Sequence, residues 1–237
     1  MNIKTTSKEA KNKRGIEFII TQDDRFKDID LIGFKLRISN GNKSYIVRNS
    51  KDFFDSIINS GEYQISKELI LDETTLKDWI DEEDIEIIKY IAKLKGLKCK
   101  GSFIYGDSDF LASVLEKMIG KTLKMDIGPL EEQVKVKEER IAVELMITDL
   151  EEKLHIEVNF DSFVIPLLIE KGYIYYENSI VKLEEEQEKI LVPLYSKSLE
   201  SENYEIILKN SEREYFLKNT LKEIKNIKEI RLIYSNL

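Results

Sequence analysis

The sequence predicts an α+β fold, in which antiparallel hairpins form sheets and helices pack on one face of them, with two subdomains as an option. Three observations support this. Several short stretches alternate apolar and polar residues, which is typical of strands with one buried face. Other stretches repeat apolar residues every three or four positions, as an amphipathic helix does. Finally, Asn40-Gly41 separates two alternating stretches, and this pair is a strong signal for a β-hairpin.

The first half of the chain is expected to hold one hairpin and several helices. The hairpin runs from Leu31 to Val47. Ser50 is expected to cap the helix that follows, and Gly61 to end it. An extended segment, a helical turn and two amphipathic helices are expected next, over residues 63–71, 75–80, 81–95 and 108–119.

Strand-like alternation dominates the second half. A helix is expected over residues 183–194. Another is expected to begin at Ser211 and continue to Lys225, because Ser211 and Glu214 have the spacing of a capping box. The alternation predicts a hairpin over residues 173–183 and strands over residues 141–148, 154–160, 205–208 and 229–234.

The change from helices to strands divides the chain into three predicted parts. Residues 1–14 are polar and rich in lysine, so we expect a flexible basic N-terminus. Residues 15–128 are expected to form a helix-rich α+β subdomain. Residues 129–237 are expected to form a strand-rich α+β subdomain.

The composition limits the function classes. Of the 237 residues, 42% are hydrophobic, which is too many for a disordered chain. The net charge of −8 does not suit binding to a phosphate backbone, which needs lysine and arginine. A single cysteine rules out an internal disulfide and a multi-cysteine zinc site, and it predicts a cytoplasmic protein. No apolar run approaches the roughly 20 residues of a membrane span, so no membrane is expected as a partner.

Residues that commonly carry catalysis are present but isolated. His155 is the only histidine, and it is predicted to lie on the polar face of a strand without the partner that a general base needs. Gly120-Lys121-Thr122 lacks the earlier glycine of a phosphate loop, because Leu115 occupies that position. Cys99, between two lysines, is interpreted as an ordinary exposed or half-buried thiol. The sequence therefore predicts no catalytic residue and no cofactor.

Acidic residues gather at two expected helix starts. The helix macrodipole favours negative charge there, so we interpret Asp81–Asp84 as a helix start and not as the metal-binding motif of a helicase. Asp107 and Asp109 also suit a helix start. A metal-dependent enzyme that uses these two aspartates, for example a nuclease, is the least favoured alternative, because the sequence supplies no further ligands for the ion.

Eight basic residues are the candidate contacts to nucleic acid or to a partner. Three surround the predicted hairpin tip, two follow the helix over residues 81–95, and three recur along the C-terminal helix. They are Lys35, Arg37, Lys43, Lys98, Lys100, Lys218, Lys222 and Lys225. The alternative interpretation is that they form solvated faces that keep the domain soluble.

The order of the elements resembles that of a known bacterial family. Four stretches carry the resemblance, in the order FKLRISNGNKSYIVRNSKDFFDSI, LILDETTLKDWIDEEDIEIIKYI, GYIYYENSIVKLEEEQEKILVPLY and EREYFLKNTLKEIKNIKEIRL. They are similar to the bacterial Swi/Snf helicase-associated domain, the accessory region of Firmicute Swi/Snf-family DNA-dependent ATPases. Together they span most of the chain from Leu31 onward.

The resemblance implies a non-catalytic accessory segment of a DNA translocase. In that family the domain lies upstream of two ATPase lobes, and many members carry a Cys/His zinc finger further upstream. This chain has neither a P-loop nor the cysteines of such a finger. The implied partner is the Swi/Snf-type ATPase core of the full-length protein, and the implied role is to position the motor, a partner or the substrate.

Two hypotheses follow for how such a domain acts. The leading one is docking onto a basic surface of the motor, because the chain is acidic. The second is direct binding of nucleic acid such as duplex DNA, which requires the hairpin lysines and the C-terminal lysines to share one face.

Overall fold

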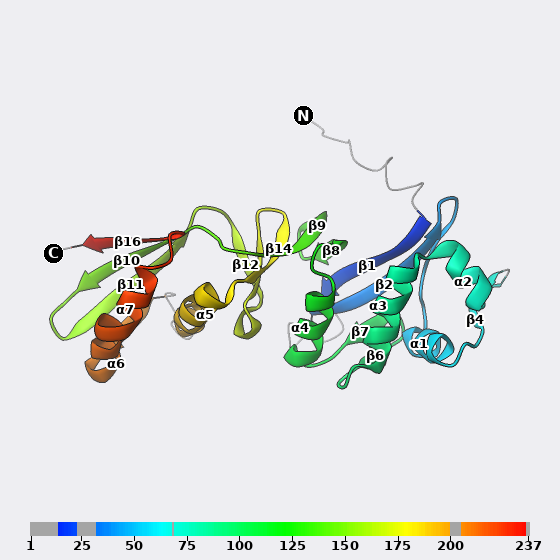
Figure 1. Cartoon of the computed structure of the whole chain (residues 1–237), viewed down its shortest axis with the longest axis horizontal. Helices are drawn as coiled ribbons and strands as arrows, with labels where there is room; N and C mark the ends of the chain where they lie inside the picture. The colour runs from blue at the N-terminus through cyan, green and yellow to red at the C-terminus, as the bar shows by residue number, and fades with distance from the viewer. Residues whose placement is uncertain (1–13, 23–31, 68, 200–204, 236–237) are drawn as a thin grey trace, which may run out of the picture. The chain divides into compact units, whose positions relative to one another are not determined.

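The computed structural model describes residues 14–22, 32–67, 69–199 and 205–235, and it confirms the α+β class (Figure 1). The chain divides into two compact units, Met1–Val134 and Lys135–Leu237, and the division falls within strand β9 (Leu130–Glu139). The predictions for residues 1–13 and for the first residue of the hairpin, Leu31, lie outside the described residues.

The first unit is built on a mixed sheet with the strand order β8-β1-β2-β7-β6, and β3 also pairs with β2. β1 and β2 are antiparallel, whereas β8 runs parallel to β1. β2 and β3 form the hairpin that was predicted around Asn40-Gly41. The strands of this unit are β1 (Arg14–Gln22), β2 (Ile32–Asn40), β3 (Ser44–Ile46), β6 (Lys98–Lys100), β7 (Phe103–Tyr105) and β8 (Thr122–Ile127).

Helices cover one face of this sheet, and Figure 1 shows α3 in front of β2. That face is apolar because Phe34, Leu36 and Ile38 of β2 are almost fully buried. At its edge the rings of Tyr45 and Trp79 lie 6.4 Å apart. The covering elements are α1 (Ser50–Ile58), β4 (Tyr63–Ser66), β5 (Leu69–Leu71), α2 (Glu73–Trp79), α3 (Glu82–Lys93) and α4 (Ser108–Lys117).

The predicted cap of α1 is wrong by one residue. Asn49 is the N-cap, and its Oδ1 accepts the backbone N–H of Asp52 at 3.4 Å. Ser50 is instead the first helical residue, and its N–H donates to the carbonyl of Gly101 at 2.9 Å. Ser50 is fully buried, so packing against the turn between β6 and β7 decides its place, whereas the exposed Asn49 is free to cap.

Gly33 on β2 is required by the close approach of β7. A Cβ there would lie 2.6 Å from the Phe103 ring and would also clash with the carbonyl oxygen of Ile104. The requirement is therefore steric, and the Phe103 ring and the β7 backbone have to shift to admit any side chain.

We expect Gly33→Ala to lower the free energy of unfolding of the first unit by about 1–3 kcal/mol, because overpacking displaces the ring and the strand. Urea denaturation followed by the fluorescence of Trp79, the single tryptophan, measures this. Gly61→Ala is the control, since its Cβ would meet nothing closer than 3.7 Å. Equal loss in both variants would contradict the steric explanation.

The second unit has a sheet with the strand order β15-β11-β10-β16, in which β16 runs parallel to β10. A hairpin of β13 and β14 is paired to β12 on one side and, in parallel, to residues 135–139 of β9 on the other. The predicted strands and hairpin of this half are confirmed. They are β10 (Val143–Asp149), β11 (Lys153–Phe160), β13 (Tyr173–Tyr176), β14 (Ser179–Leu183), β15 (Ile206–Lys209) and β16 (Ile230–Ser235). Strand β12 (Val164–Leu168) was not predicted.

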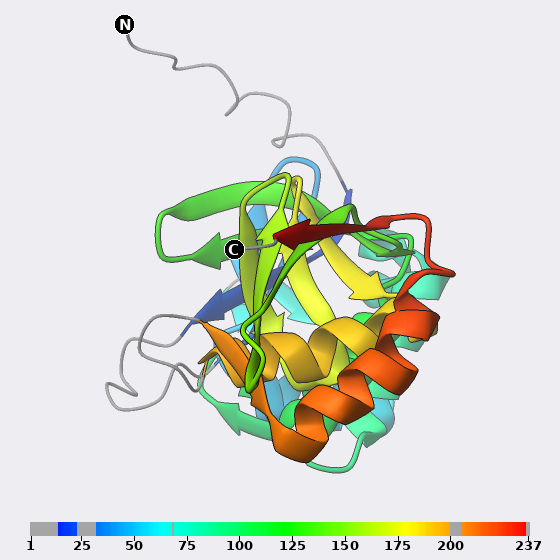
Figure 2. The same cartoon turned by 90° about the vertical axis from the view of Figure 1, so that its left-hand side faces the viewer.

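Helix α5 (Glu185–Leu199) and the segment α6 (Asn210–Tyr215), η3 (Phe216–Thr220) and α7 (Leu221–Ile224) lie side by side along one side of this sheet (Figure 2). α5 runs through Pro193, beyond its predicted end at Leu194. Ser198, one turn after Leu194, is also buried against the core, and this burial outweighs the hydrogen bond that proline removes.

The predicted capping box at Ser211 and Glu214 is wrong. α6 already begins at Asn210, and no side chain caps it. Glu214 instead forms an ion pair with Lys218, one turn further along the helix, with 2.9 Å between Oε2 and Nζ. The five-residue turn η3 has the wider π-helical pitch, so one residue bulges and the spacing of side chains changes in the middle of the predicted helix.

Gln187 of α5 fixes the helix to the entry of β10. Its side-chain Oε1 accepts the N–H of Ile141 at 2.9 Å, and its Nε2 donates to the carbonyl of the same residue at 2.7 Å. Gln187 is fully buried and Ile141 is 1% exposed. The amide thus replaces a neighbouring strand for two backbone groups that would otherwise be buried without partners.

We expect Gln187→Leu to destabilise the second unit by about 1–3 kcal/mol for each backbone group left unpaired. Urea denaturation followed by circular dichroism gives the loss of stability, and amide hydrogen exchange at Ile141 and along α5 locates it. Gln64→Leu, at an exposed glutamine of β4, is the control. Unchanged exchange at Ile141 in the Gln187 variant would contradict the assigned role.

Candidate interaction surfaces

One face of the first unit's sheet gathers four of the predicted basic residues. Phe34 pairs with Ile104, and Ile104 pairs with Cys99, so these three share the helix-covered face. Residues alternate between faces along a strand, so the neighbouring positions lie on the opposite face. The "basic sheet face" is that opposite face of β2, β6 and β7, formed by Lys35, Arg37, Lys98, Lys100, Phe103 and Tyr105.

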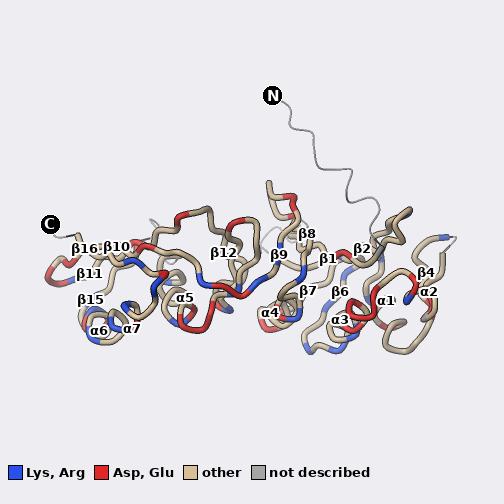
Figure 3. Tube along the Cα trace, turned by 45° about the horizontal axis from the view of Figure 1, so that its top comes forward, with Lys and Arg blue, Asp and Glu red and all other residues tan. Residues whose placement is uncertain are grey.

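The three strands of the basic sheet face contain no aspartate or glutamate. Lys98 and Lys100 are exposed and Lys35 is partly exposed. The charge of Arg37 is partly neutralised, because Arg37 donates to Glu17 of β1 at 2.6 Å. Lys43 lies in the turn after β2 and is exposed, outside the strands. These three strands thus carry lysine and arginine without acidic residues, although the chain as a whole is acidic; Figure 3 marks the charged positions along the trace.

Two aromatic rings lie in the middle of the basic sheet face, and the sequence predictions missed them. The rings of Phe103 and Tyr105 are stacked, with centroids 5.6 Å apart and planes inclined by 20°. Phe103 lies against Gly33 and is fully buried, whereas Tyr105 is partly exposed. Alternation within β7 indicates that the two rings share a face, but their stacking depends on Gly33, about 70 positions earlier.

The remaining three predicted contacts belong to the second unit. Lys218, Lys222 and Lys225 lie on or just after η3 and α7, and all three are exposed. Lys218 pairs with Glu214, and the ring of Tyr215 nearby is 65% exposed. The basic residues thus form two sets, one in each unit.

Acidic residues predominate in the second unit. Residues 135–237 contain 21 aspartates and glutamates against 15 lysines and arginines, whereas residues 1–134 contain 24 against 22. The first turn of α5 is acidic, and Arg140 pairs there with Glu184 at 2.8 Å and with Glu186 at 2.6 Å. Six of the eight net negative charges therefore belong to the second unit.

The residues considered for catalysis have other roles. His155 lies between Glu157 and Glu205 at 3.7 and 3.9 Å, distances too long for a hydrogen bond. Asp107 caps α4 by accepting the N–H of Phe110 at 2.9 Å, and Lys121 pairs with Asp84 at 2.8 Å. In the part of the chain that the structure describes, no three residues among His, Cys, Asp and Glu are grouped to hold a metal ion.

Cys99 is half-buried, as predicted, on the face of β6 that points away from the two flanking lysine side chains. Burial, together with a smaller effect of the Asp55 carboxylate, raises the pKa of the thiol to about 11, and Lys51 opposes this shift. The thiol is therefore almost entirely protonated at neutral pH, and the thiolate is the reactive form.

We expect the rate of Cys99 alkylation by iodoacetamide to rise about tenfold per pH unit from neutral pH to about pH 10 without a plateau. Mass spectrometry across this pH range measures the rate, and N-acetylcysteine, which levels off near its ordinary pKa of about 8.5, is the control. A plateau for the protein at that same pH would contradict the effect of burial.

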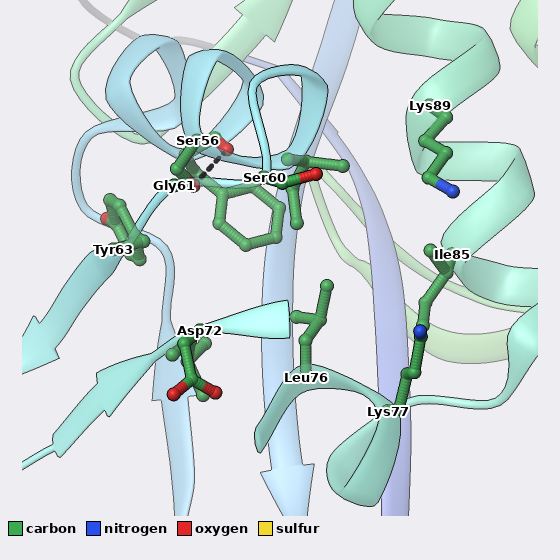
Figure 4. A pocket seen from close by; sticks show the side chains of 12 residues that line it. Ser56, Ser60, Gly61, Tyr63, Asp72, Leu76, Lys77, Ile85 and Lys89 are labelled. Atoms are coloured by element: carbon green, nitrogen blue, oxygen red, sulfur yellow. Dashed lines mark hydrogen bonds between the residues drawn. The ribbon is translucent and has the colours of Figure 1, made fainter. Parts of the chain in front are cut away.

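A pocket of about 480 Å³, open to solvent, lies between α1, β5, α2 and α3 of the first unit. Phe53, Leu76 and Ile85 are among the apolar residues that line it. Figure 4 shows Lys77 and Lys89 on the same side of it. Asp72 lies on another side and caps α2 by accepting the N–H of Thr75 at 2.7 Å.

Both units combine a sheet with helices packed on one side, and both carry charged residues at their surfaces. None of its described helices is long and apolar enough to cross a membrane. A family model described as bacterial SNF2 helicase associated matches residues 108–235, more than half of the chain, and the chain belongs to this family. The match confirms the resemblance and includes its third and fourth stretches, whereas the first two precede it. No curated protein and no solved structure matches the chain.

Proposed function

We propose that the chain is a non-catalytic accessory domain that docks onto the ATPase core of a bacterial Swi/Snf-type translocase in the cytoplasm and positions the motor or its substrate. The observation that carries the proposal is the acidic second unit, which makes up most of the family match. An acidic surface attracts a basic one, and a motor that binds the DNA backbone needs basic surfaces.

Exposed carboxylates without an ion-pair partner are the groups best placed for such docking. Glu138, Glu151 and Glu152 of the second unit are exposed, and none of them pairs with a described cation. A carboxylate already engaged within the domain, such as Glu184 with Arg140, contributes less to a partner because its charge is partly neutralised.

We expect the combined change Glu138→Gln, Glu151→Gln and Glu152→Gln to weaken docking to a Swi/Snf-type ATPase core by about threefold to tenfold. Calorimetric titration of the core with the full chain, at about 50 and about 300 mM salt, measures the affinity and its salt dependence. The change should reduce both.

The matched control is Glu62→Gln, Glu82→Gln and Glu116→Gln, three exposed acidic residues of the first unit. Equal weakening in the two triple variants would mean that docking depends on net charge in general and not on the proposed surface. No docking by the unaltered chain at low salt would overturn the proposal.

Direct contact with nucleic acid is the second candidate function. The basic sheet face favours it, because its strands carry four cations and no carboxylate. Binding at this face would involve only the first unit, so the eight predicted basic residues need not all lie on one face.

A further inference from the structure

Strand β16 differs from three other edge strands, β6, β12 and β15. A sheet edge can pair with another chain, and proteins block such pairing with lysine, proline, bulges or very short strands. β6 has three residues, two of them lysines, β12 contains Pro166 and a shift in register, and β15 has four residues and ends with Lys209. β16 has six residues, no lysine, no proline and no shift in its pairing with β10. It therefore lacks the protection that the other three edges have.

The open side of β16 presents backbone groups that are available for pairing. Among the described residues, β10 is the only strand that pairs with β16, and Figure 1 shows β16 as the outermost strand beside it. The N–H of Val143 in β10 donates to the carbonyl of Glu229 at 2.9 Å, so the odd-numbered residues of β16 face β10 in this parallel ladder. Leu232 and Tyr234 consequently turn their N–H and carbonyl groups to the open edge.

The side chains on the helix-covered face of β16 match one another when two copies are paired antiparallel. Leu232 packs against the core of the unit, and Tyr234 on the same face is 52% exposed. A two-fold axis at Leu232 places this residue opposite its own copy and Tyr234 opposite the partner's Ile230. The pairing therefore brings apolar side chains together and covers the exposed tyrosine ring.

The other face of β16 also tolerates this register. Arg231 then lies opposite the partner's Ile233, so the two arginines are not directly opposed. The charge of Arg231 is moreover offset within its own copy by Glu144 of β10, at 3.6 Å. Neither face of the paired strands thus sets like charges against each other.

We propose that β16 joins two copies of the chain, with the two strands antiparallel and the four-stranded sheets continuous across a two-fold axis. This association closes at two copies, because each copy contributes the same strand and both open β16 edges are used. A pair of six-residue strands is a small interface, so the dimer is expected to be reversible and not obligate. The inference goes beyond docking onto the motor, since β16 contains none of the carboxylates assigned to docking.

Sedimentation equilibrium of the full chain from about 5 to about 500 μM tests the proposal, and the unaltered chain should pass from monomer to dimer in this range. Tyr234→Pro removes an N–H that points to the open edge, a position at which an edge strand tolerates proline. The two-fold axis makes this a loss of two hydrogen bonds, so the variant should dimerise at least about tenfold more weakly.

Tyr234→Val is the matched control, because valine keeps the N–H and favours a strand. It should weaken the dimer less than Tyr234→Pro does. Equal weakening in the two folded variants would mean that the ring holds the copies together and not the pairing of the strands, and this would overturn the proposal.

Amide hydrogen exchange of the unaltered chain gives a test that does not depend on the folding of a variant. The N–H groups of Leu232 and Tyr234 should exchange more slowly as the protein concentration rises. Those of Arg231 and Ile233 face β10 already in the monomer, so they are the internal control and should change less.

The salt dependence separates self-association from docking onto the motor. Each copy has a net charge of −8, so two copies repel, and raising the salt from about 50 to about 300 mM should strengthen the dimer. Docking onto a basic surface should weaken over the same range. A chain that stays monomeric at the higher salt, association beyond a dimer, or exchange at Leu232 and Tyr234 that does not depend on concentration would overturn the proposal. Slower exchange there only with the ATPase core present would assign the edge to the motor and overturn it as well.

Discussion

In each unit, helices are packed against one face of a sheet, and the surface properties of the chain follow from this. A covered face must be apolar, as Phe34, Leu36 and Ile38 are in the first unit. The alternation of side chains along a strand then places every second residue on the other face, where charged groups keep their hydration. Lys35 and Arg37 are on that face because their neighbours must be buried.

In the second unit, helix α5 is held against its sheet by apolar packing and also by a polar contact between Gln187 and Ile141. Apolar burial is not directional, so it does not set the position of α5 along the sheet by itself. The two hydrogen bonds between Gln187 and Ile141 are directional, and both groups are buried. A shift of the helix by one residue would leave both backbone groups unpaired, so this contact opposes a change in the register of α5.

The sequence predicted those elements whose signals are local. The hairpin at Asn40-Gly41 and the paired strands β10 and β11 follow from the turn pair and from the alternation of neighbouring residues. β1 was missed because Phe18, Ile19 and Ile20 are consecutive apolar residues and all are buried. Its sequence therefore lacks the alternation of apolar and polar residues by which the other strands were predicted. The cap at Ser50 and the capping box at Ser211 were mispredicted because packing and the actual start of the helix decide which polar residue caps. The aromatic stack was missed because its position depends on Gly33, which is distant in the sequence.

The lysines of β6 also have a simpler explanation, which accounts for only part of what is observed. β6 is three residues long and forms the edge of its sheet, and lysines on a short edge strand prevent pairing with other chains. Edge protection explains Lys98 and Lys100. It does not explain the cations on β2, an interior strand, or the absence of carboxylates from three neighbouring strands of an acidic chain.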